Sequence, residues 1–395
     1  MKDKVLCKIR LFFWIVLLWA GVSSLALYGQ TTIRGDVNGD SAVNIIDALM
    51  IAQYSVGLGP AGFNVNVAEV SCDGTVNIID ALKVAQYYVG LVNSLNCGGT
   101  PAPTRTPTMG PTTGPTATPG TKYVGNSTWF DALGSPYGGC GLNQSVLDTQ
   151  HFVALNVQNS PGDATMLTRP ITDPGKIGMW NNGLNCGRWV RVTISDYCNG
   201  TNDGALGQPF CRNGSGWVTD AYNGATLDMI VADSCHDPNG WCRDDPNHLD
   251  LAHASLNQFV KDGKPVGDMD PNHFNNRQIS WYFIEAPNYT GDIRIGFLQG
   301  AQAWWTAIAI THLKNGIHGV DYWDGSSWVK AKMNGDMGQS YIISPTVEGG
   351  DQYRIRVYDV NDQLINNGRI YNFPFAASCE YQCSGPWTEA DYTIE

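Results

Sequence analysis

The sequence predicts a mostly β protein of two or three domains, preceded by a small α-helical module. Three observations predict this class. First, 395 residues are too many for one compact domain. Second, an acidic loop followed by an amphipathic helical stretch occurs twice near the start. Third, short β-prone stretches separated by Gly-, Asn- and Cys-rich loops fill the chain after a Pro/Thr-rich segment.

Residues 1–29 have the features of a secretory signal peptide. A basic head is followed by an apolar run from Leu11 and by small residues near Ser24 and Ala26. The alternative is an uncleaved anchor helix, but the apolar run is near the lower limit for crossing a bilayer. We therefore expect a secreted, extracellular protein that has no membrane contact once the signal is cleaved.

The composition argues against nucleic acid as a partner, because the net charge is −12 and no basic patch is evident. Of the 11 cysteines, one lies in the signal, and the even remainder favours disulfides. Zinc is the competing interpretation, but no second close Cys or His pair completes a tetrahedral set. The sequence does not fix the complete pairing, and the candidate bridges are Cys198/Cys211, Cys235/Cys242 and Cys379/Cys383, with Cys140/Cys186 as a longer one.

The stretch "VNIIDALMIAQYSVGL" at 43–58 recurs as "VNIIDALKVAQYYVGL" at 76–91. Each copy ends a loop that offers oxygen ligands at positions 1, 3, 5, 9 and 12 of an EF-hand loop. The expected calcium ligands are Asp36, Asn38, Asp40, Asn44 and Asp47 in the first loop, and Glu69, Ser71, Asp73, Asn77 and Asp80 in the second. We expect weaker binding in the second, because a Glu replaces the first Asp and Ser is a poorer ligand. The helix after the first loop is expected to bury Ala48, Leu49, Ala52 and Val56.

This loop–helix–loop–helix pattern, without the entering helices of an EF-hand pair, resembles the type I dockerin, over residues 35–92 of a predicted domain at 31–97. The resemblance implies a scaffoldin cohesin as partner and cellulosome attachment. It places the partner surface at loop positions 10 and 11, which are Ile45, Ile46, Ile78 and Ile79. The near-identical copies suggest that either half could dock after a half-turn rotation. The alternative is calcium that serves stability only.

Residues 98–121 form a Pro/Thr/Gly linker that cannot bury a core. Residues 122–277 then run in short β-prone stretches, which predict a small barrel tied by disulfides. "GGCGL", "CGRWVRVTISDYC", "VADSCHDPNGWC" and "NHLDLAHASLNQF" together resemble the six-stranded double-psi β-barrel of expansins, which family-45 endoglucanases share. The segment around 200–225 fits less well and looks like an inserted loop.

Residues 278–377 alternate in polarity and predict a β-sandwich, followed by a tail at 378–395. The segment resembles the second expansin domain, an immunoglobulin-like cellulose-binding sandwich packed on the barrel. The resemblance places Trp304 and Trp305 on a flat aromatic row that stacks on sugar rings. Neighbours on a regular strand point to opposite faces, so we expect a local bulge, or else one Trp in the core. Tyr341 is the candidate third aromatic, with Tyr322 or Trp323 as substitutes.

In the barrel, the resemblance places Thr128, Asp233 and Asp250 in a polysaccharide-contacting groove. Asp250 matches the family-45 acid, which expansins keep while lacking the base. Asp131 falls within one residue of the position of that base, so it is the candidate base if it faces Asp250 across about 6.5–9.5 Å. The alternatives are a solvent-facing Asp131 and a structural role for Asp233 or Asp250. We expect His248 to point to the opposite face and to be structural.

The expected function is therefore that of a cellulosome-associated expansin-like protein. It would bind cellulose, with xylan or mixed-linkage glucan as further candidates, and loosen plant cell walls without hydrolysis. The first alternative is a weak endo-β-1,4-glucanase with Asp250 as acid and Asp131 as base. The second is a carbohydrate-binding module with neither activity.

Overall fold

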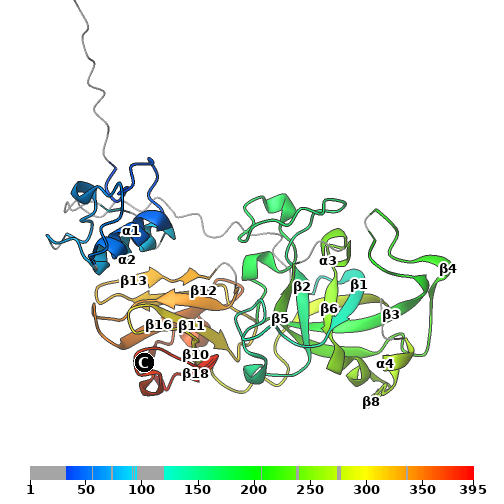
Figure 1. Ribbon diagram of the computed structural model, residues 1–395. Coiled ribbons are helices and arrows are strands. Elements are labelled where there is room, and N and C mark those ends of the chain that lie inside the picture. The colour runs from blue at the N-terminus through cyan, green and yellow to red at the C-terminus, as the bar shows by residue number, and fades with distance from the viewer. Residues whose placement is uncertain are drawn as a thin grey trace, which may run out of the picture. The chain divides into compact units, whose positions relative to one another are not determined.

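The computed structural model describes residues 33–395, apart from 56, 73, 91, 93, 96–119, 206, 237–239, 274–276 and 335–336. The predicted signal peptide and residues 98–119 of the predicted linker lie outside the described residues. The chain divides into two compact units, Met1–Thr104 and Arg105–Glu395. Helices dominate the first and strands the second, so the predicted fold class is confirmed (Figure 1).

The first unit is built from the two repeats, which give helices α1 (Ile45–Ser55) and α2 (Ile78–Tyr88) with the short η1 (Val65–Val67) between them. Both helices begin in the same way. The Asn44 side chain accepts from the N–H of Ile46, and Asn77 accepts from Ile79 in a capping box. The helices pack on each other through a common core: Ala48, Ile51, Ala81 and Val84.

The predicted buried face of α1 is partly wrong. Ala48 is buried as expected, but Leu49 is 53% exposed and Ile51 is buried instead. The reason is that nearly every position of this helix is apolar, so hydrophobicity alone does not identify its inner face. Ala52 is half-buried, and Val56 lies outside the described residues.

Six strands of the second unit close into a ring. Their hydrogen-bonded order is β3-β9-β1-β6-β2-β5, and β5 pairs again with β3. Their bounds are β1 (Tyr123–Phe130), β2 (Phe152–Asn156), β3 (Trp189–Thr201), β5 (Thr226–Cys235), β6 (Leu249–Ala252) and β9 (Arg277–Ile284). The pairs β1/β6 and β2/β5 are parallel and the others antiparallel. A closed six-stranded barrel results, filled by side chains such as Val153, Val190, Val231, Leu249 and Trp281.

Shorter elements extend the barrel. They are β4 (Arg212–Val218), β7 (Val260–Lys261), β8 (Lys264–Pro265), α3 (Gly240–Asp244), α4 (Met269–Asn272), η2 (Gln144–Val146), η3 (Pro174–Lys176), η4 (Asn181–Gly183) and η5 (His253–Gln258). The four expected disulfides Cys140–Cys186, Cys198–Cys211, Cys235–Cys242 and Cys379–Cys383 are present.

Two five-stranded sheets form the sandwich, in the orders β14-β15-β11-β10-β18 and β13-β12-β16-β17-β19. The first contains β10 (Arg294–Leu298), β11 (Thr306–Thr311), β14 (Lys332–Met333), β15 (Ser340–Ile343) and β18 (Trp387–Glu389). The second contains β12 (Gly319–Trp323), β13 (Trp328–Lys330), β16 (Gln352–Tyr358), β17 (Tyr371–Pro374) and β19 (Thr393–Ile394), with η6 (Ile365–Asn367) and η7 (Ala377–Cys379) in the connections. Phe297 of one sheet meets Phe373 of the other edge-on at 5.9 Å, in the common core.

Two expected boundaries within this unit differ from the structure. β9, expected at the start of the sandwich, pairs with β1 and β3 and completes the barrel. The expected tail contributes β18 and β19, one to each sandwich sheet. Alternating polarity identifies a strand but not the sheet that receives it, which explains both differences.

The outer face of the barrel packs into the hydrophobic core of the sandwich. Outward-facing barrel residues such as Phe152, Ile230 and Ala252 belong to the same buried cluster as the sandwich interior. Backbone bonds join the two parts, since Gly338 N–H donates to the Gly139 carbonyl and Gln339 N–H to that of Cys140. The groove residues therefore stand beside a buried interface.

Candidate functional site: a groove on the barrel and an aromatic turn on the sandwich

Strand register brings three of the predicted groove residues into one row. Thr128 of β1 is level with Asp250 of β6, which is level with Ala154 of β2. A register shift in the β2/β5 pair then makes Asp233 the partner of Ala154. Four adjacent strands thus carry the row, and its side chains face outward because Leu249 and Leu251 on either side of Asp250 fill the barrel.

His248 belongs to this row, which corrects the expectation that it points to the opposite face. It is fully buried, and its Nε2 lies 2.9 Å from Thr128 Oγ1 and 3.3 Å from Asp250 Oδ1. Residues two apart on an extended chain share a face, so the spacing from His248 to Asp250 already contained this signal. An ionised Asp250 can only accept, so this contact requires a proton on Nε2.

Asp233 is held by backbone donors at the end of the row. Its Oδ1 accepts from the N–H of Gly139 at 2.5 Å and from that of Ser234 at 2.8 Å. Burial raises the pKa of this carboxyl above its ordinary value, and the nearby charge of Asp250 raises it further. Asp233 therefore keeps its proton to a higher pH than an exposed aspartate and can then donate a hydrogen bond.

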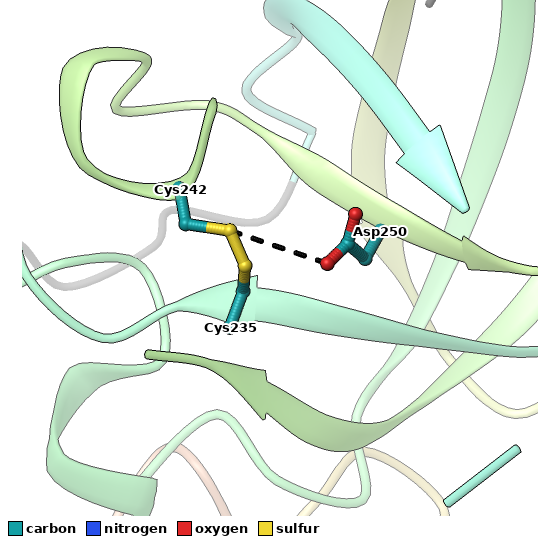
Figure 2. Close-up of side chains that lie close together, drawn as sticks. All are labelled: Cys235, Cys242 and Asp250. Atoms are coloured by element: carbon teal, nitrogen blue, oxygen red, sulfur yellow. Dashed lines mark hydrogen bonds between the residues drawn. A yellow bond between two sulfur atoms is a disulfide. The ribbon is translucent and has the colours of Figure 1, made fainter. Parts of the chain in front are cut away.

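A disulfide forms the wall beside Asp250. Figure 2 shows Cys235–Cys242 and the Asp250 carboxylate pointing toward each other, with Cys242 Sγ 4.0 Å from Asp250 Oδ2. Although these three residues have the proximity of a metal-ligand group, oxidised sulfurs have no thiolate to offer a metal. Phe130 and Trp241 pack on the same disulfide, so apolar side chains border the row at this end.

Asp131 lies apart from the row. Its Oδ1 is 3.4 Å from His253 Nδ1, and its side chain is 83% exposed. His253 also stacks on Trp129, whose ring packs against the barrel interior, whereas Phe130 packs on the cluster that contains the Cys235–Cys242 disulfide. Asp131 is thus directed to the side of Trp129, away from Thr128 and Asp250.

A tight turn, not a bulge, exposes both tryptophans of the sandwich. Gln302 and Trp305 exchange two backbone hydrogen bonds of 3.0 Å, which leaves Trp304 in the turn between them. Trp304 is 59% and Trp305 39% exposed, so neither is a core residue. Thr306 Oγ1 donates to the Gln302 carbonyl, and the Tyr353 hydroxyl donates to that of Ala303, so buried side chains support the turn.

Tyr341 does not join these tryptophans, which corrects its prediction as the third aromatic. It is 1% exposed, and burial raises the pKa of its hydroxyl. On β15 it faces inward because its partner Ile308 lies in the core. The substitutes Tyr322 and Trp323 are half-buried and belong to the other sheet.

One barrel loop connects the groove with the aromatic turn. In this loop Gly139 donates to Asp233, and two residues earlier the Tyr137 hydroxyl accepts from the N–H of Gln299 at 2.6 Å. Gln299 begins the connection that carries Trp304 and Trp305. The two sets of sugar-contacting candidates are therefore fixed to each other by hydrogen bonds.

In the first unit, the residues of the first acidic loop fit a cation. Asp36 and Asp47 are nearly buried, and each accepts several backbone N–H groups of the loop. Two buried carboxylates in one loop need compensating positive charge. Asp40 and Asn38 lie beside them, hydrogen-bonded to each other, and the Asn44 side chain caps α1.

The second loop repeats this fold with a different charge environment. Asp80 is fully buried and accepts from Val70, Ser71 and Asn77, as Asp47 does from its equivalents. The Glu69 carboxylate, however, is paired with the Arg34 guanidinium at 2.7 Å. Asp73 lies outside the described residues. The four isoleucines of the expected partner surface are 48–57% exposed: Ile45, Ile46, Ile78 and Ile79.

Comparison with known proteins finds one family model and one expansin-like relative. Residues 34–88 match the family model of the dockerin type I domain. Expansin-like protein 6 of Dictyostelium discoideum is 25% identical over 148 residues, which are 38% of this chain and 47% of that protein. The chain carries a type I dockerin and is similar to expansins. It spans about half the length of this curated relative.

Two solved structures of the Clavibacter michiganensis expansin are also similar. A point mutant in complex with cellohexaose shares 16% identity and a TM-score of 0.41, and the apo form 17% and 0.40. Each match covers 69% of this chain and 96% of the other. None of the helices that the structure describes combines the length and hydrophobicity that a membrane crossing requires.

Proposed function

We propose that this chain is a secreted, cellulosome-attached protein that binds cellulose and loosens plant cell-wall polysaccharides without hydrolysing them. One observation carries the proposal. Thr128, Asp250 and Asp233 lie in a single outward-facing row, whereas Asp131 is paired with His253 on the other side. Inverting hydrolysis needs an acid and a base on opposite faces of the scissile bond, and this groove offers its carboxyl groups in one row.

The row can bind a glucan chain by exchange of hydrogen bonds. Asp250 accepts from sugar hydroxyls, Thr128 can donate or accept, and protonated Asp233 can donate. The net free energy of each such bond is about 1 kcal/mol, which is similar to that of the bonds between glucan chains that it replaces. A chain held along the groove would therefore detach from its neighbour at little net cost.

The sandwich and the dockerin supply the two attachments. Trp304 and Trp305 present flat apolar faces to the sugar CH groups of cellulose. Calcium bound by the two acidic loops would hold α1 and α2 in the orientation that exposes the four isoleucines to a cohesin. Xylan and mixed-linkage glucan are further candidate ligands, because the groove residues recognise hydroxyl groups without an evident requirement for one sugar.

Reducing-sugar release from amorphous cellulose and from mixed-linkage glucan tests the proposal against the glucanase alternative. We expect the wild type to release no more sugar than Asp131→Ala and Asp233→Ala at equal protein concentration. Steady turnover that Asp131→Ala abolishes would overturn the non-hydrolytic proposal and assign that residue as the base.

A further inference from the structure

The connection after β17 exposes an aromatic ring that the groove and the turn do not use. Tyr381 is 90% exposed, more than any other large hydrophobic side chain among the described residues. Phenol rings suit sugars because the face contacts CH groups while the hydroxyl reaches a sugar hydroxyl.

A short closed loop holds Tyr381. The disulfide Cys379–Cys383 spans a sequence separation of 4, and Gln382 N–H donates to the Cys379 carbonyl at 2.8 Å across it. Glu380, next to the tyrosine, has a φ of 50°, which turns the backbone at this point. A ring on a closed loop loses less conformational entropy on binding than a ring on an open one.

This loop lies beside the segment that leads to the tryptophans. Gly300 N–H donates to the Cys383 carbonyl, and Cys383 N–H donates to the Ala301 carbonyl, both at 2.9 Å. The Gln299 side chain adds a bond to the Ser384 carbonyl at 3.1 Å. Two independent chain segments thus bring Tyr381 and the tryptophan turn to the same end of the sandwich.

We propose that Tyr381 is the third aromatic of the glucan-binding surface that begins at Trp304 and Trp305. The ligand is a β-1,4-linked glucan, whose flat sugars stack on successive rings. This inference rests on the proposed cellulose binding. It gives the surface an aromatic from the C-terminal loop in place of the buried Tyr341.

Adsorption of the full chain to microcrystalline cellulose, with calcium present, tests the inference. Tyr381→Ala is expected to raise the dissociation constant about three- to tenfold, which is the range that the loss of one ring contact gives. Tyr381→Phe keeps the ring and should stay within about twofold of the wild type. The matched control is Ile394→Ala, which removes an apolar side chain of 55% exposure. That residue pairs with Tyr371 at the start of β17, the end opposite to the closed loop, and no effect is expected.

The outcomes separate the two proposals. If the wild type adsorbs and Trp304→Ala/Trp305→Ala weakens adsorption, but Tyr381→Ala behaves like Ile394→Ala, the role of Tyr381 is wrong while cellulose binding stands. If the wild type does not adsorb to cellulose, both are wrong. If Tyr381→Phe loses as much affinity for cellulose as Tyr381→Ala, the contact is made by the hydroxyl and not by the ring, which would overturn stacking.

Discussion

At the scale of single residues, the row around Asp250 combines a charge with a buried imidazole that orients it. The Asp250 side chain is 17% exposed, so it can reach a ligand while the buried His248 ring contacts its carboxylate. A carboxylate fixed in this way accepts stronger hydrogen bonds than a neutral group. Asp250 is therefore the residue of the row on which wall loosening is expected to depend most.

The substitution Asp250→Asn tests this dependence. It keeps the size of the side chain and an oxygen that can accept from His248, so the fold should be retained. Wall-loosening activity is expected to fall about tenfold or more, as the loss of a charge-assisted bond predicts, whereas adsorption to cellulose should be unchanged. Unimpaired loosening by the variant would contradict the role of Asp250, and thermal unfolding serves as the control for folding.

Asp233 predicts a specific pH dependence of stability. Its pKa in the folded state lies above the ordinary 3.8, so the folded protein binds this proton more tightly than the unfolded chain does. The contribution is fully present below 3.8 and is lost as the pH rises through the folded pKa. Relative to Asp233→Asn, the free energy of unfolding of the wild type should therefore decrease with rising pH across this window. Parallel pH profiles from urea unfolding would show that Asp233 does not titrate as described.

The residues of the row lie in short motifs, which make them recognisable in the sequence as candidates. The positions of Asp250 and Thr128 followed from such motifs, and the strand register places them side by side. The orientation of His248 was predicted wrongly, because residues 248 and 250 are two apart on an extended chain and therefore share a face. Tyr341 was misplaced because an exposed and a buried tyrosine look alike in a strand that is apolar on both sides. Tyr381 gave no motif signal, since it follows a cysteine in a loop.

At the scale of elements, the loop that follows β1 fixes the groove relative to the sandwich. A Cβ on Gly139 would lie 2.1 Å from Ser234 Oγ and 2.6 Å from Ser234 Cβ. Gly139→Ala should therefore push the loop away from β5 and cost about 1–3 kcal/mol of unfolding free energy. The matched control Gly319→Ala meets only Lys330 and Tyr358 atoms at 3.6 Å or more, and should stay within about 0.5 kcal/mol of the wild type. Equal effects of the two variants in urea unfolding would contradict this close packing.

The two calcium loops are expected to differ because of their first ligand. Glu69 is longer than aspartate and is paired with Arg34, which competes with a cation for the same carboxylate. Glu69→Asp should therefore tighten the weaker calcium site severalfold in a calorimetric titration. Asp36→Glu makes the reciprocal change in the first loop and should weaken the tighter site. Two sites of equal affinity in the wild type would be incompatible with this difference.

Element types were more predictable than their assignment to sheets. The repeats indicate where α1 and α2 begin, because the capping Asn and Asp recur at the same spacing in both copies. The segment of β9 was recognisable as a strand, and that of β18 was assigned to the tail. The strands with which both pair depend on long-range contacts that local alternation of polarity does not encode. The sandwich thus contains two strands, β18 and β19, that the sequence assigned to a tail outside it.

At the scale of the whole molecule, the second unit presents two candidate polysaccharide-binding sites that one set of hydrogen bonds holds in place. Tyr137, Gly139 and Gln299 connect the Asp250 groove with the Trp304 turn. A glucan held by stacking at one end and by hydrogen bonds at the other would be separated from its neighbour without bond cleavage. The dockerin would add a tether that concentrates this activity at the cellulose surface.

Loosening without hydrolysis can be tested on plant cell wall itself. Strips of plant cell wall are held under constant load in a bath of the full-length protein, and extension and dissolved reducing sugar are recorded together. We predict extension that depends on Asp250, with sugar release no higher than that of the bath without protein. Extension that rises in proportion to released sugar, and stops when Asp131 is replaced by alanine, would contradict it.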